Sequence, residues 1–178
     1  RVLRDVRMTD PELIIDRYPH QLSGGQIQRI MIAMGLLMKP KLYIADEPTS
    51  ALDVTVQAQI LKLLKDLKRE YGISILFITH DIAVASIIGD SIMVLYAGQL
   101  MELGAMKDII YEPRHPYTQA LLNSIPRVSK VEGKLPMIGG SVPNLLNPPP
   151  GCRFHPRCPN AKDLCSKMVP NLVRVDNV

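Results

Sequence analysis

The stretch LSGGQIQRIMIAMGLLMKPKLYIADEPTSALD, which runs from Leu22 to Asp53, decides the fold of this chain. Its first part has the pattern of a helix start, because Ser23 is a capping residue and Gln26, three positions later, completes a capping box. The uncovered backbone N–H groups of such a start favour an anion. Residues 42–47 then form an apolar strand that ends in two carboxylates, which a core accepts only around a cation or a water. The stretch therefore predicts a phosphate site followed by a Mg²⁺ site.

Two more polar residues stand at the ends of expected elements. Asp53 is a good cap for a helix over residues 54–71, and His80 directly follows a second apolar strand, residues 73–78. Taken alone, His80 would be a satisfied core histidine, and Ser23 and Asp53 would only cap their helices. The order of the motifs along the chain decides between these interpretations.

LSGGQ, a strand ending in Asp46-Glu47, SALD and then His80 occur in an order that resembles the nucleotide-binding subunits of ABC transporters. The resemblance implies an α/β fold, namely part of the P-loop NTPase-type ABC ATPase domain, in which helices flank a parallel sheet. It implies ATP and Mg²⁺ as cofactors and ATP hydrolysis as the activity. It also implies that a second ABC ATPase subunit pairs head to tail with this one.

The resemblance assigns roles to individual residues. Glu47 is the candidate base that orients the attacking water, His80 would hydrogen-bond the γ-phosphate, and Asp46 would hold Mg²⁺ through water. The LSGGQ signature would complete the nucleotide site on the partner's P-loop. Asp53, directly before the helix over residues 54–71, would contact the partner across the dimer. The nucleotide-binding candidates are thus Ser23, Gly24, Gly25, Gln26 and Asp53.

A P-loop, which would wrap the nucleotide phosphates in backbone N–H groups and a lysine, is missing from the sequence. The one Gly-Lys pair, Gly133-Lys134, is followed by Leu135, and Val128 stands where the first glycine should be. In the family, the P-loop and a glutamine loop precede the signature. Since the chain begins with Arg1 rather than Met, we expect it to be the carboxy-terminal half of a longer subunit and to be inactive alone.

Composition agrees with a globular protein that has an aliphatic core. The chain of 178 residues is 47% hydrophobic and 4% aromatic, with no Trp. Its net charge of +4 comes from 21 basic and 17 acidic residues, which is too balanced for a nucleic-acid footprint. No apolar run reaches the roughly 20 residues that span a bilayer. We therefore expect a soluble, intracellular protein. The resemblance to ABC transporter subunits implies that it lies peripherally on the cytoplasmic face of the membrane.

The remaining pattern predicts the order of elements. A signature helix over residues 25–38 is apolar nearly all round and should be largely buried, and the strand over residues 42–47 should be buried on both faces. A short helix over residues 81–88 precedes a hairpin of residues 91–96 and 99–103 around Ala97-Gly98. The alternation of strands and helices implies a parallel sheet.

We place a domain boundary after residue 125. Residues 1–125 would belong to the ATPase domain, and residues 126–178 would form a Pro- and Cys-containing extension, extended over residues 126–150. The segment HPYTQALL, in which Pro116 would open a short helix, is similar to one found in the oligopeptide and dipeptide importer branch.

The three cysteines of the extension also resemble that branch, where a cysteine-rich tail can bind an iron–sulfur cluster. Cys152, Cys158 and Cys165 are therefore candidate ligands of a cluster. A cluster needs four thiolates, so a fourth ligand would have to lie beyond Val178, or His155 would have to substitute. The alternative is three reduced free thiols.

The predicted function is thus that of an ATPase subunit energising import of oligopeptides or dipeptides, or of related small solutes such as nickel complexes. Its partners would be membrane permease subunits and, indirectly, an extracellular or periplasmic solute-binding protein. One alternative is an ABC ATPase coupled to nucleic acid, against which the balanced charge argues, so we expect no nucleic-acid partner. Another alternative is a non-enzymatic metal-binding or interaction module.

Overall fold

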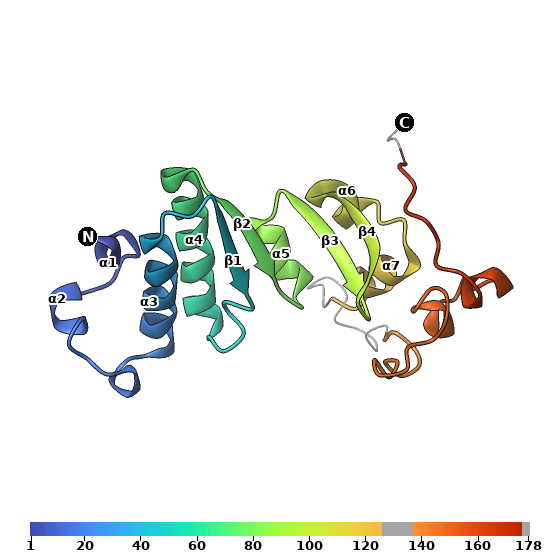
Figure 1. Cartoon of the computed structure of the whole chain (residues 1–178), viewed down its shortest axis with the longest axis horizontal. Helices are drawn as coiled ribbons and strands as arrows, with labels where there is room; N and C mark the ends of the chain where they lie inside the picture. The colour runs from blue at the N-terminus through green and yellow to red at the C-terminus, as the bar shows by residue number, and fades with distance from the viewer. Residues whose placement is uncertain (126–136, 176–178) are drawn as a thin grey trace, which may run out of the picture. The chain divides into compact units, whose positions relative to one another are not determined.

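The computed structural model describes residues 1–125 and 137–175, which form two compact units, Arg1–Gly89 and Asp90–Val178 (Figure 1). Residues 126–136 lie outside the described residues. They comprise the beginning of the segment 126–150, which we expect to be extended, and the Gly133-Lys134 pair. The domain boundary expected after residue 125 stays a prediction. None of the described helices is long and apolar enough to cross a membrane.

The first unit is a two-stranded parallel sheet with helices packed on it. Strand β1 (Leu42–Asp46) pairs with β2 (Ser74–Ile78), and helix α4 (Val54–Tyr71) connects them along the chain. Figure 1 shows α3 and α4 side by side next to this sheet. The remaining helices of the unit are α1 (Val2–Asp5), α2 (Pro11–Ile14), a 3₁₀ turn (Pro19–Gln21), α3 (Gly24–Leu37) and α5 (Ile82–Ile88). The predicted parallel sheet is confirmed.

Helix α4 forms where its sequence predicts it. The Asp53 carboxylate accepts a hydrogen bond from the Val56 N–H at 3.0 Å, and Gly72, with φ of +62°, ends the helix in a left-handed conformation. One face carries the buried leucines and isoleucine of the helix, namely Ile60, Leu61, Leu63, Leu64 and Leu67. Burial of this stripe against α3 and the sheet holds the unit together.

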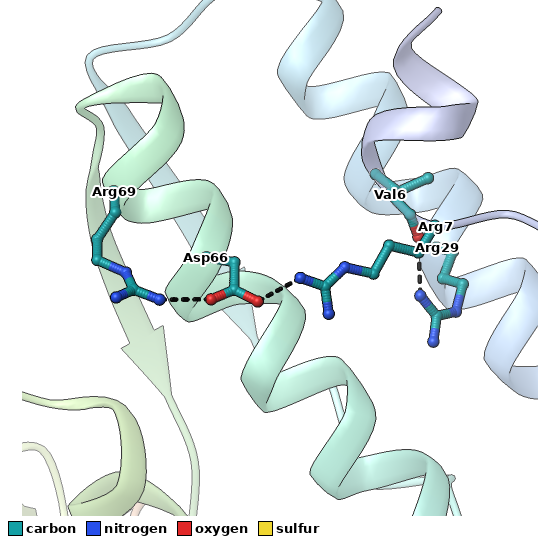
Figure 2. A network of polar contacts seen from close by, with 5 residues as sticks. All are labelled: Val6, Arg7, Arg29, Asp66 and Arg69. Carbon is teal, nitrogen blue, oxygen red and sulfur yellow. Dashed lines mark hydrogen bonds and ion pairs between the residues drawn. The ribbon is translucent and has the colours of Figure 1, made fainter.

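Polar contacts on the surface link the segment that follows α1 to α3 and to α4 (Figure 2). Asp66 on α4 pairs with both Arg69, at 2.6 Å, and Arg7, which follows α1. Arg29 on α3 donates to the Val6 carbonyl at 2.8 Å. The hydrogen bond from Arg69, and then that from Arg7, lowers the pKa of the Asp66 carboxyl.

The sequence overestimates burial in this unit at two places. On α3, Ile32, Ala33 and Leu36 are buried, but Met31, Met34 and Leu37 are exposed, because α1 and α4 cover one side of the helix. The expectation of a largely buried signature helix is therefore wrong.

The strands show the same departure. In β1, Ala45 is buried whereas Leu42 and Ile44 are exposed, and in β2 Leu76 and Ile78 are exposed. The expectation of a strand buried on both faces is wrong, because helices of the described chain pack on only one face of this sheet.

The second unit is built on an antiparallel hairpin. Strands β3 (Ser91–Tyr96) and β4 (Gln99–Ala105) are joined at Ala97 and Gly98, whose φ angles of +49° and +77° suit a tight two-residue turn. The predicted hairpin is confirmed, with β4 two residues longer than expected. Helix α6 (Met106–Tyr111), which follows it, was not predicted, because its N-cap is Ala105 and gives no side-chain capping signal.

Helix α7 (Pro116–Asn123) begins at Pro116 as predicted, and a buried carboxylate fixes its start. The two oxygens of Glu102 accept hydrogen bonds from the backbone N–H groups of Arg114 and His115, at 2.7 and 3.1 Å. Burial lowers the pKa of His115, whose Nδ1 accepts from the Tyr117 N–H. Leu122 is buried and Leu121 half-buried, so this helix packs back on its unit.

The carboxy-terminal segment packs on the hairpin through Phe154, which is fully buried. Its ring centre lies 5.2 Å from those of Tyr96 and Tyr117. Arg157 donates to the Ile138 and Gly139 carbonyls and to the Tyr96 hydroxyl. Residues 137–150 contain no helix or strand, as expected of an extended connection, while short 3₁₀ turns occupy His155–Arg157 and Asp163–Ser166.

The aromatic cluster predicts the response of the second unit to substitution. Phe154→Ala should destabilise this unit by about 3–5 kcal/mol, because it removes a fully buried ring and leaves a cavity. Denaturant unfolding followed by tyrosine fluorescence measures the change. Tyr111→Ala, at an exposed aromatic of the same unit, is the matched control and should change stability by less than about 0.5 kcal/mol. Equal stability of the two variants would contradict the packing role of Phe154.

Candidate functional site

The pairing of the two parallel strands brings Glu47 and His80 together. In the register, Asp46 at the end of β1 lies opposite Ile78 at the end of β2, so the residues that follow both strands emerge at the same edge. The Nδ1 atom of His80 lies 3.0 Å from Oε1 of Glu47. Two residues separated by 33 positions thus form one hydrogen-bonded pair.

The backbone of Glu47 has a left-handed conformation, with φ of +42°, which is unfavourable for a residue with a side chain. Contacts on both sides hold it. Its N–H donates to the Ile78 carbonyl at 3.0 Å, and its carbonyl accepts from the N–H and the hydroxyl of Ser50. Strain of this kind is often found at functional sites, which marks Glu47 as a residue worth testing.

His80 is not a core histidine, because its side chain is 75% exposed. The hydrogen bond that the His80 ring donates to Glu47, and then the negative charge of that carboxylate, raises the pKa of His80 above its usual value. With Nδ1 directed at Glu47, the protonated ring keeps Nε2–H free to donate to a phosphate oxygen. A neutral ring could do this only with the proton on Nε2.

Asp46 fits a divalent cation. It is the last residue of β1, it is exposed, and its carboxylate makes no hydrogen bond or ion pair within the described parts of the chain. Magnesium prefers carboxylate oxygens and retains several waters and phosphate oxygens as ligands. One exposed carboxylate, directly before Glu47 in the chain, is compatible with that requirement.

The signature forms the capping box that the sequence predicts. Ser23 Oγ accepts from the Gln26 N–H at 3.3 Å, and Gln26 Oε1 accepts from the Ser23 N–H at 2.9 Å. Gly24 and Gly25 are the first two residues of α3, so their N–H groups have no partner within the helix. The helix start therefore offers donors for an anion.

The glycines of the signature also have a packing reason. A Cβ atom on Gly25 would lie 2.7 Å from Cγ1 of Val56, and one on Gly24 would lie 3.3 Å from Leu52. The signature thus rests on the loop before α4 and on its first turn. Asp53 caps α4 as expected, and its contact across a dimer stays a prediction.

The sequence of each unit matches a known family. Residues 1–50 match the ABC transporter family, and residues 101–165 match the oligopeptide/dipeptide transporter C-terminal region. The oligopeptide transport ATP-binding protein OppD of Salmonella typhimurium is 51% identical over 170 residues, which cover 96% of this chain and 51% of that protein. The dipeptide transport ATP-binding protein DppD of Bacillus subtilis is 49% identical over 165 residues, which cover 93% and 49%.

The chain belongs to the ABC transporter family. Solved structures agree. The dimeric post-hydrolysis state of the ATP-binding cassette MJ0796 bound to ADP and Pi is 36% identical, with a TM-score of 0.51 over 59% of this chain and 44% of that one. The structure of cbiO1 from Clostridium perfringens, part of the ABC transporter complex cbiONQ, is 36% identical, with a TM-score of 0.56 over 62% and 43%. The predicted ABC ATPase fold is confirmed.

The chain spans about half the length of the curated relatives it matches. Of the predicted residues, the structure brings Glu47 and His80 together at the sheet edge and Ser23 to Gln26 against the start of α4. It shows no contact between these two groups within the described residues.

Within the described residues, the three cysteines of the extension belong to no group of side chains that could hold a metal ion. Cys152, Cys158 and Cys165 are free thiols packed into the apolar cluster around Phe154. The Cys152 N–H donates to the Cys165 carbonyl at 2.8 Å, but residues 1–125 and 137–175 contain no group of three or more His, Cys, Asp or Glu that could hold a metal ion. The predicted iron–sulfur cluster is not supported by the described residues, in which the three thiols pack near Phe154.

Sequence reasoning missed Thr49 and Gln57 at this site. Together with Glu47 and His80 they line a small cavity of about 120 Å³, whose other lining residues are Ser50, Leu52, Thr79 and Asp81. Gln57 stands on the buried stripe of α4, three positions before Ile60 and seven before Leu64. A polar residue on an apolar stripe was the signal that could have found it.

The Glu47–His80 pair predicts a measurable titration. In the wild-type chain the pKa of His80 should lie above the usual value of about 6.5, because the Glu47 carboxylate favours the protonated ring. Glu47→Gln should lower it, since a neutral amide loses the charge. NMR titration of the ring protons measures both, and His115 in the other unit should titrate alike in the two chains. A His80 pKa that does not change on substitution would show that the pair is absent in solution.

Proposed function

We propose that this chain is part of an ATP-binding and ATP-hydrolysing subunit that energises the import of oligopeptides or dipeptides. The observation that carries the proposal is the Glu47–His80 hydrogen bond at the edge of the parallel sheet. The pair brings a carboxylate and an imidazole together, and the exposed carboxylate of Asp46 directly precedes Glu47 in the chain. Two relatives that are 51% and 49% identical to this chain have names that state oligopeptide and dipeptide transport, which supports the choice of solute.

The residues at the sheet edge suit hydrolysis of a phosphoanhydride. Glu47 would orient and polarise the attacking water, and protonated His80 would donate from Nε2 to the γ-phosphate. Asp46 would hold Mg²⁺, which supplies neutralising charge to the phosphate oxygens when bound. The left-handed backbone of Glu47 would keep its carboxylate in place during the reaction.

The signature would act on a second subunit. The N–H groups of Gly24 and Gly25, with the hydroxyl of Ser23, would bind the γ-phosphate held on that subunit's P-loop. In this arrangement Asp53 would contact the partner, and each site would close only in the head-to-tail dimer. A solved ATP-binding cassette that is 36% identical is described as a dimer with ADP and Pi, which supports this arrangement.

The subunit would bind peripherally to membrane permease subunits on the cytoplasmic side, and a solute-binding protein outside would deliver the peptide. The names of the relatives as transport ATP-binding proteins support these partners.

Substitution of Glu47 tests the catalytic assignment in the full-length subunit. Glu47→Gln should lower kcat for ATP hydrolysis by about 100-fold or more, because the water loses its base, and should leave ATP binding intact. Steady-state phosphate release and equilibrium nucleotide binding measure the two effects. Glu112→Gln, at an exposed carboxylate of α6's end, is the matched control and should retain wild-type turnover. Near-normal turnover of Glu47→Gln would remove Glu47 from the mechanism.

Substitution of Ser23 tests the proposed dimer. Ser23→Arg should abolish ATP-driven dimerisation, because a large cation at the helix start blocks the approach of the partner's nucleotide. Nucleotide binding to the P-loop of each subunit should persist. Size-exclusion chromatography in the presence of ATP measures dimerisation, with Ser141→Arg, at an exposed position, as the control. Tight dimers of Ser23→Arg would contradict the role of the signature.

A further inference from the structure

The conformation of Glu47 depends on the loop that follows it, residues 47–53. Ser50 closes the first turn of this loop by donating twice to the Glu47 carbonyl, and the Leu52 N–H donates to the Thr49 carbonyl at 3.2 Å. These bonds lie within the loop itself. They do not explain what fixes the loop to the rest of the unit.

Thr49 supplies that attachment. It is only 4% exposed, and its Oγ1 accepts a hydrogen bond from Nε2 of Gln57 at 3.1 Å. Gln57 belongs to the first turns of α4, whose start is fixed by the Asp53 cap and whose apolar face is buried in the core. The Thr49–Gln57 bond therefore ties the loop to the helix that carries the buried leucine stripe of the unit.

The bond lies beside the reacting groups rather than at a distance from them. Thr49 and Gln57 line the same cavity of about 120 Å³ as Glu47 and His80. Loss of the bond would leave a buried donor or acceptor without a partner, which is costly, so the loop would shift to satisfy it. A shift of the loop allows Glu47 to relax from its left-handed backbone.

We propose that Thr49 and Gln57 are positioning residues that hold Glu47 in its left-handed conformation, with its carboxylate directed at His80. They touch neither substrate nor cofactor in this role and act through the loop. The catalytic consequence rests on the function proposed above, whereas the consequence for the loop does not.

The test in the full-length subunit separates positioning from simple stability. Thr49→Val keeps the shape of the side chain and removes Oγ1, so kcat for ATP hydrolysis should fall about tenfold with the KM for ATP unchanged. Thr49→Ser retains the hydroxyl and should restore turnover. Thr55→Val, at an exposed threonine of the same helix, is the matched control and should behave as wild type.

A second variant tests the pair as a unit. Gln57→Leu removes the donor and should lower kcat as much as Thr49→Val. The double variant should lose no more than either single one, because both substitutions break the same bond. Additive losses, or a change in KM alone, would overturn the proposal.

Amide hydrogen exchange in the 178-residue chain gives a readout that needs no activity. The Glu47 and Ser50 amides should exchange about tenfold faster in Thr49→Val, while the Leu64 amide in the core of α4 should keep its protection. If the wild-type full-length subunit does not hydrolyse ATP, the proposed function is wrong. The exchange rates of the Glu47 and Ser50 amides then still test whether Thr49 and Gln57 position Glu47. Unchanged exchange at Glu47 and Ser50 overturns the positioning whatever the activity.

Discussion

The parallel pairing of β1 with β2 is the constraint on which the first unit depends. Its register places Asp46 opposite Ile78, and this brings the residues after both strands to one edge. The Glu47 N–H continues the pairing by one bond, to the Ile78 carbonyl, before the chain turns away with a left-handed φ. A shift of the register by one residue would exchange the faces of the strand and separate Glu47 from His80. The candidate chemistry is thus a consequence of sheet pairing.

Helix α4 is the second support of the site. Its first turn receives the signature, because Gly25 packs on Val56 without room for a Cβ atom. It also receives the loop after β1, because Gln57 holds Thr49. One helix start, capped by Asp53, therefore anchors both the start of α3, the candidate anion site, and the loop that follows Glu47. Burial of the leucine stripe along the same helix stabilises this arrangement.

In the second unit the carboxy-terminal segment is held by aromatic packing and by arginines. Phe154 packs against both Tyr96 and Tyr117, whose rings also contact each other, and Arg157 donates to backbone carbonyls of residues 138 and 139. The cysteines pack in the same apolar cluster. The described residues contain no group of side chains around them that could hold a metal ion. The match of residues 101–165 to the C-terminal region of oligopeptide/dipeptide transporters includes most of these contacts.

The sequence by itself determined the main elements other than α6, their order and the family, because caps, glycines and apolar periods act locally. Asp53, Gly72 and the Ala97-Gly98 turn specify where α4 and the hairpin begin and end. The tertiary structure alone decided which apolar faces are covered: Met34 and Ile44 are exposed although their sequence pattern predicted burial. It alone decided the left-handed backbone of Glu47, the Thr49–Gln57 bond and the packing of the cysteines. The backbone of Glu47 and the packing of the cysteines depend on contacts between residues distant in the chain, which no local pattern encodes. Of the Thr49–Gln57 bond the sequence shows only a polar residue on an apolar stripe, without its partner.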